Sequence, residues 1–238
     1  MNTHTRSANT FAGLMALAAT GTTIYAGISS HGLHPVNGLA LLALAAATSR
    51  MKVRLPGLTG TMSVNLPFLL TAAVNLSSLE TAVIAAVCGL VQSWPKSGQA
   101  WKLQQAWFNV NMMVLAATVT SLLFHSGSSL LAGPLGLAAA ALSLFLGQTA
   151  PVSAIIALTE GAAVRRVWMS IAHLSFPYYV ASAGLASFLE LIHRNTSLLL
   201  ALTALAIMYG MHRSYRTYFQ SMPAAQAAPS SLAMAARA

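Results

Sequence analysis

Residues 104–125 read QQAWFNVNMMVLAATVTSLLFH and contain no Asp, Glu, Lys or Arg. A helix needs about 20 mostly apolar residues to cross the hydrocarbon core of a bilayer. This stretch has that length, and its polar side chains are amides and hydroxyls that neighbouring helices can pair with. It therefore predicts a transmembrane helix, and the segments on either side of it repeat the pattern.

Further apolar segments predict an all-α, polytopic transmembrane bundle of about eight helices. Besides residues 104–125, they cover about residues 11–29, 36–49, 59–74, 79–94, 130–158, 168–192 and 196–211. Pro67 and Pro177 fall inside two of these segments and predict interruptions there. In transporters such broken helices often mark a substrate site, whereas a tolerated kink is the plainer explanation.

The composition favours a membrane protein over a soluble one. Of 238 residues, 56% are hydrophobic and only 6% are charged, against roughly a quarter charged in soluble domains. The net charge of +9 could suggest nucleic-acid binding. We expect no nucleic-acid partner, because the basic residues stand singly or in small groups between apolar runs. The single cysteine, Cys88, excludes an intrachain disulfide.

The basic residues also predict the orientation of the bundle. Alternate crossings from a cytoplasmic N-terminus place every Lys and Arg except Arg194 on one side of the membrane. The cytoplasmic loops of membrane proteins carry an excess of cations. We therefore expect the protein to lie in the inner membrane, with both of its termini in the cytoplasm. The basic residues on the inner side are Arg6, Arg50, Lys52, Arg54, Lys96, Lys102, Arg165, Arg166, Arg213, Arg216 and Arg237.

The ends of the chain are expected to lie outside the bundle. Residues 1–10 form a short cytoplasmic N-terminus, and residues 11–212 form the transmembrane bundle. The apolar residues 11–27 also resemble a signal peptide, but the segment is long enough to span and is expected to be retained. Residues 213–220 are a basic and aromatic juxtamembrane helix end, and residues 221–238, rich in Ala, Ser and Pro, are expected to be disordered.

Polar residues in the cytoplasmic half of the predicted bundle are the candidate ligand-binding residues. Burying them without a partner in hydrocarbon is costly, so they either pair between helices or line a hydrated cavity. Both interpretations stay open. We expect a small ligand of unknown identity, with no cofactor and no metal ion. The candidates are Asn65, Gln92, Gln105, Asn109, Gln148 and His173.

Other patterns predict structure rather than chemistry. Gly136, Ala140, Ser143 and Gly147 form a small-residue stripe suited to close helix packing. On the outer side, a group of histidines and the carboxylates Glu80 and Glu190 lack the spacing of a metal site. No catalytic motif is present and the chain has no Asp, so we expect no enzymatic activity.

Several stretches resemble the multi-helix membrane-associated sensor regions found before HD-GYP phosphodiesterase and diguanylate cyclase (GGDEF) domains in bacteria. The resemblance covers about residues 10–220, and no output domain follows in this sequence. It is carried by SVNLP at residues 63–67, QAWFN at 105–109, AIIALTEG at 154–161, VW at 167–168 and YRTY at 215–218.

The resemblance implies a bacterial inner-membrane input module that detects a ligand or a membrane state and signals through its last helix. A cytoplasmic output protein would then be its partner. These stretches also look distantly like the substrate-capturing membrane subunits of vitamin transporters, whose partner would be a transport ATPase. We expect a sensory module first and a transporter subunit as the alternative.

Overall fold

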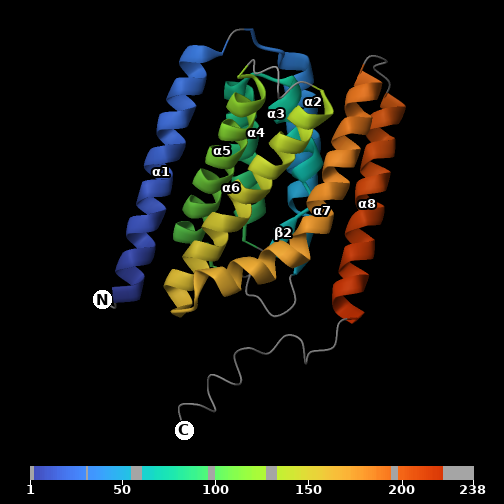
Figure 1. Ribbon diagram of the computed structural model, residues 1–238. Coiled ribbons are helices and arrows are strands. Elements are labelled where there is room, and N and C mark those ends of the chain that lie inside the picture. The colour runs from blue at the N-terminus through green and yellow to red at the C-terminus, as the bar shows by residue number, and fades with distance from the viewer. Residues whose placement is uncertain are drawn as a thin grey trace.

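The computed structural model describes residues 3–30, 32–54, 61–95, 100–126, 133–193 and 198–221. Within these residues the chain forms eight helices and one two-stranded β-hairpin (Figure 1). The fold is therefore helical apart from the hairpin. In chain order the elements are α1 (Thr3–Ser29), α2 (Pro35–Ser49), β1 (Lys52–Arg54), β2 (Thr61–Ser63), α3 (Leu66–Asn75), α4 (Ser78–Ser93), α5 (Leu103–Phe124), α6 (Pro134–Glu160), α7 (Val164–His193) and α8 (Leu198–Ser221).

Most helices lie where the apolar segments predict them, and their ends have local causes. Helix α6 begins at Pro134, since proline lacks the N–H that a first turn leaves unpaired. It ends before Gly161, whose φ of 68° is the left-handed conformation that closes many helices. Helix α8 continues through residues 213–220 to Ser221, and the expected disordered tail beyond it lies outside the described residues.

The third predicted segment, residues 59–74, is wrong at its start. Thr61–Ser63 form strand β2, which pairs antiparallel with β1 in the register Lys52↔Ser63 and Val53↔Met62. Helix α3 begins only at Leu66, so Pro67 lies in its first turn rather than interrupting it. Proline is favoured in a first turn because the missing N–H costs no hydrogen bond there.

Helix α3 is short and lies at the centre of the bundle. Its 10 residues span about 15 Å, half of a hydrocarbon core of about 30 Å. The side chains from Leu66 to Ala73 are all buried, and the helix contacts α2, α4, α5, α6 and α7. The segment that begins at the hairpin and ends at Asn75 is therefore non-helical in its first part and helical in its second.

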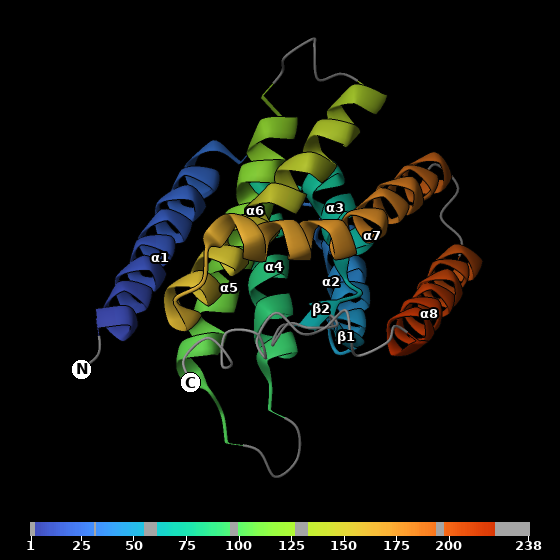
Figure 2. The ribbon, with the colours of Figure 1, turned by 60° about the horizontal axis from the view of Figure 1, so that its bottom comes forward.

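Helices α2, α4, α5, α6 and α7 pack around α3. Figure 1 shows α1 at one edge of the bundle and α8 at the other, with the N-terminal end of α1 and the C-terminal end of α8 at the same end as the hairpin. Helix α7 first crosses that end and then turns to run along the bundle, as Figure 2 also shows. Pro177 lies inside α7, and a proline frees the carbonyl four residues earlier and bends its helix.

Glycines bring α4, α5 and α6 close together. A Cβ on Gly89 of α4 would lie 2.8 Å from the Cα of Val110 on α5. A Cβ on Gly147 of α6 would lie 2.9 Å from the Cβ of Ala116. The same stripe of α6 supplies Ser143, whose hydroxyl accepts a hydrogen bond of 3.1 Å from Thr120. The predicted small-residue stripe thus packs against α5.

Three of the described helices are long and apolar enough to cross a membrane: residues Arg6–Ser29, Leu103–Phe124 and Leu135–Glu160. Helices α2, α3 and α4 are apolar but have only 10–17 residues each. The outward face of α1 and α2 is strongly apolar, with Leu17, Ile28 and Val36 all more than 70% exposed. The fold therefore confirms a helical bundle with membrane-crossing potential.

Candidate functional site

A cluster of uncharged polar side chains lies at the start of α3. Asn65, the residue before the helix, is 4% exposed, and its Nδ2 donates a hydrogen bond of 2.9 Å to the Oγ of Ser49 at the end of α2. The thiol of Cys88 on α4 is buried beside both side chains. Three elements therefore meet at the point where the chain passes from hairpin to helix.

Strand β2 extends the cluster toward the end of α4. The hydroxyl of Ser63 donates to the Oε1 of Gln92 over 2.8 Å, and its Oγ lies 3.2 Å from the carbonyl oxygen of Ser49. The amide of Gln92 in turn contacts the Sδ of Met113 on α5 at 2.6 Å. We call Ser49, Ser63, Asn65, Cys88 and Gln92 the inner polar cluster.

Asn109 lies beside this cluster rather than within it. Its Nδ2 donates a hydrogen bond of 3.2 Å to the Oγ of Ser93, the last residue of α4 and the neighbour of Gln92. The structure therefore gathers three predicted residues, Asn65, Gln92 and Asn109, at one end of the bundle between α2, α4 and α5. None of the groups in the cluster carries a full charge.

The other predicted residues do not join this cluster. Gln105 is exposed, because it lies one turn before Asn109, beyond the level of Ser93 where α4 ends. Gln148 is paired across the α6–α7 interface, where the hydroxyl of Tyr179 donates to its Oε1 over 2.8 Å. His173 is exposed on α7. The structure therefore brings three of the six candidate residues together and leaves these three apart, and the role of all six in ligand binding stays a prediction.

Three residues of the inner polar cluster, Ser49, Ser63 and Cys88, are not among the candidates that the sequence predicts. Ser49 closes an apolar helix and precedes Arg50, so it reads as a boundary residue. Cys88 reads as a small buried residue within an apolar run. One sequence signal could have identified Ser49. It lies at the cytoplasmic end of one predicted helix, at the same level as Asn65 near the start of the next.

At the opposite end of the bundle, Glu80 joins the beginnings of α2 and α4 by hydrogen bonds. Its Oε2 accepts hydrogen bonds from the Oγ of Ser77 at 2.7 Å and from the N–H of Ser77 at 3.1 Å. Its Oε1 accepts one of 2.7 Å from the N–H of His34, before α2. Among the described residues no three His, Cys, Asp or Glu side chains gather as metal ligands. The exposed His125, which follows α5, has its Nδ1 2.8 Å from the carbonyl oxygen of Ser121, whereas the side chains of Glu190 and His193 lie outside the description.

The hairpin lies between the inner polar cluster and the last helix. Ser63 of β2 belongs to the cluster, whereas β1 packs against α8, as Figure 2 shows. Apart from β1, α8 contacts mainly α7 in the described chain. A shift of the hairpin would therefore act directly on the position of α8.

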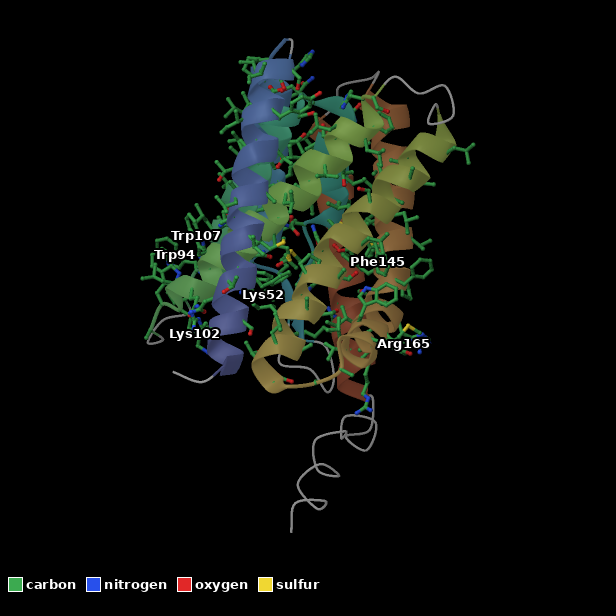
Figure 3. The ribbon with its side chains drawn as sticks, turned by 60° about the vertical axis from the view of Figure 1, so that its left-hand side comes forward. Lys52, Trp94, Lys102, Trp107, Phe145 and Arg165 are labelled. Carbon is green, nitrogen blue, oxygen red and sulfur yellow. The ribbon has the colours of Figure 1, made fainter. Side chains whose placement is uncertain are left out.

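The described cations gather at the hairpin end. Figure 3 shows Lys52, Lys102 and Arg165 in the same half of the bundle, on different sides of it. Arg6 in the first turns of α1 and Arg216 near the end of α8 belong to that end as well. Glu80 lies at the opposite end. The grouping of cations that the sequence predicts is thus present in the fold.

Fold and site together define a helical bundle with a half-length central helix and a polar, uncharged cluster at its start. No family model matches the chain, and no curated protein or solved structure matches it either. The resemblance to membrane-associated sensor regions therefore stays a prediction.

Proposed function

We propose that the chain is a multi-pass inner-membrane protein, with both termini in the cytoplasm, that works as a non-enzymatic sensory module. In this proposal a small ligand binds at the inner polar cluster and shifts the hairpin, and the hairpin then moves α8. The observation that carries it is the position of the hairpin, which supplies Ser63 to the cluster and packs its other strand against α8. A cytoplasmic output protein would read the movement of α8.

The chemistry of the cluster indicates the ligand class. Asn65, Gln92 and the serine hydroxyls can each donate and accept hydrogen bonds. No Lys, Arg, Asp or Glu of the described chain takes part in the hydrogen bonds of the cluster, and a buried charge without a partner is expensive. An uncharged polar molecule that replaces the Asn65–Ser49 and Ser63–Gln92 bonds fits these groups best.

Interhelical hydrogen bonds alone would be the plainer role for these residues, each contributing roughly 0.6 kcal/mol. The two roles differ in what the purified protein carries. We expect mass spectrometry of the protein, purified in detergent and then denatured, to release a small polar molecule. Asn65→Leu should lower the retained amount at least about fivefold, because one lost hydrogen bond to a buried polar group costs about 1–3 kcal/mol.

Gln105→Leu is the matched control, because Gln105 carries the same kind of amide at the same end but is exposed. It should retain the molecule at the wild-type level. Ser63→Ala, which removes a smaller group from the same cluster, covers the case in which Asn65→Leu does not fold. Equal retention in Asn65→Leu, Ser63→Ala and Gln105→Leu, or no retained molecule in the wild type, would contradict the proposal.

A substrate-capturing transporter subunit is the second candidate, and the half-length α3 favours it. Non-helical backbone at membrane depth is tolerated where it is buried in protein or lines a cavity, and transporters build substrate sites at such breaks. In this case the partner would be a transport ATPase rather than an output protein. The protein that co-purifies with the intact chain separates the two candidates.

A further inference from the structure

A shallow groove runs along the first turns of α1, on a part of the molecule that the inner polar cluster does not use. Its volume is about 410 Å³, and it is lined by Arg6, Ser7, Thr10, Phe11 and Leu14. Residues four apart lie above one another on a helix, so the groove passes from a cation through hydroxyl groups to an apolar end.

Helix α5 is fixed beside this groove. The side-chain amide of Gln104 donates a hydrogen bond to the Oδ1 of Asn9 on α1. One turn further along, the ring of Phe11 packs against that of Phe108, with 6.2 Å between the ring centroids. Lys102, the exposed residue before α5, is therefore held near the start of the groove, and Figure 3 shows it beside the lower part of α1.

Exposed indole rings lie close to the same level of the bundle. Trp107 is 59% exposed, and Trp94 and Trp101 pack together with ring centroids 5.3 Å apart. Figure 3 shows Trp94 and Trp107 just above Lys102. Because indole rings prefer the boundary between headgroups and acyl chains, the cationic end of the groove lies at headgroup level and its apolar end lies at acyl-chain level.

From this arrangement we infer that the groove binds one molecule of an acidic glycerophospholipid. Its phosphate lies between the guanidinium of Arg6 and the ammonium of Lys102, and an acyl chain lies along Phe11 and Leu14. Charge complementarity supports this occupant, since cations of α1, α5, α7 and α8 gather at this end of the described chain. Basic groups at the inner surface attract acidic lipids in the same way. The inference needs the proposed membrane location but not the proposed ligand.

Native mass spectrometry of the full chain in detergent, titrated with phosphatidylglycerol or phosphatidylcholine, tests the site. The wild type should bind one phosphatidylglycerol in preference to phosphatidylcholine. Arg6→Gln should weaken this binding about fivefold, the loss expected for one cation near an anionic surface. Arg165→Gln removes the same charge from the same end, but on the far side of the bundle from Lys102 (Figure 3), and should change binding less than about twofold.

Three results would overturn the inference. Equal weakening by Arg6→Gln and Arg165→Gln would mean diffuse attraction by the whole cationic end. Equal binding of phosphatidylcholine, whose phosphate is balanced by a quaternary ammonium, would mean that the site does not select an acidic lipid. Competition by free glycerophosphate at equal concentration would mean a site for a soluble anion. Asn65→Leu should leave lipid binding unchanged, so the lipid site and the ligand site can fail independently.

Discussion

Glu80 shows how one carboxylate can join two elements. It completes a capping box with Ser77, which satisfies two donors at the start of α4. It also accepts the N–H of His34, so the beginning of α2 is attached to the beginning of α4. A side chain that the sequence places in an outer group of histidines and carboxylates therefore has a structural role that accounts for its hydrogen bonds.

Replacing Glu80 should lower stability without affecting ligand retention. Glu80→Ala removes its bonds to Ser77 and to His34 and should cost about 1–2 kcal/mol, the usual loss when a helix cap is removed. The measurement is the free energy of unfolding in detergent. Glu80→Gln keeps an acceptor oxygen and should recover part of the loss. An unchanged unfolding free energy for Glu80→Ala would show that the cap contributes nothing.

Single residues also show where sequence reasoning stops. Position along the sequence was sufficient to place Asn65, Gln92 and Asn109 at one end of the bundle, although Asn65 precedes α3 rather than lying within a helix. Whether Gln105 shares the buried face of Asn109 depends on where the neighbouring helix α4 ends, at Ser93. That level is a tertiary property, which the spacing of residues within one helix does not contain.

At the scale of elements, close contact between α4 and α5 depends on Gly89. An added Cβ would lie 2.8 Å from the backbone Cα of Val110, so the two helices would have to separate. Gly89→Ala should therefore lower the free energy of unfolding by about 1–3 kcal/mol, as overpacking usually does. The separation should also weaken the Ser93–Asn109 bond between the same helices.

The control for this substitution is Gly21→Ala on α1, where an added Cβ meets nothing within 4 Å. Alanine is the better helix former, so this variant should be unchanged or more stable by up to about 1 kcal/mol. Thermal unfolding of both variants in one detergent measures the difference. Equal stability of Gly89→Ala and Gly21→Ala would contradict the close packing of α4 on α5.

Elements were predictable where length and apolarity determine them. Residues 104–125 and 79–94 become α5 and α4 almost without change. The hairpin was not predictable, because Thr61, Met62 and Ser63 continue into an apolar run whose helix-like composition conceals the change of structure. Its strands are short, and their pairing brings together residues that are seven to eleven positions apart, which no local pattern of β1 or β2 alone indicates.

At the scale of the whole molecule, alternating helix directions and one-sided charge support each other. The start of α1, the hairpin and the end of α8 lie at one end of the bundle, together with Lys52, Lys102 and Arg165. Glu80 lies at the other. A bilayer across the bundle would separate a cationic end from an end with few charges, which is the asymmetry expected of an inner-membrane protein.

Labelling of single cysteines in intact cells tests this central claim most directly. Arg165→Cys places a thiol at the cationic end, and Ser126→Cys places one just after α5 at the other end; both positions are exposed. Cys88 can stay, since it is fully buried. A membrane-impermeant maleimide should label Ser126→Cys in intact cells, and Arg165→Cys only after the cells are opened. Labelling of Arg165→Cys from outside intact cells would contradict the proposed orientation and the threading of the chain through the membrane.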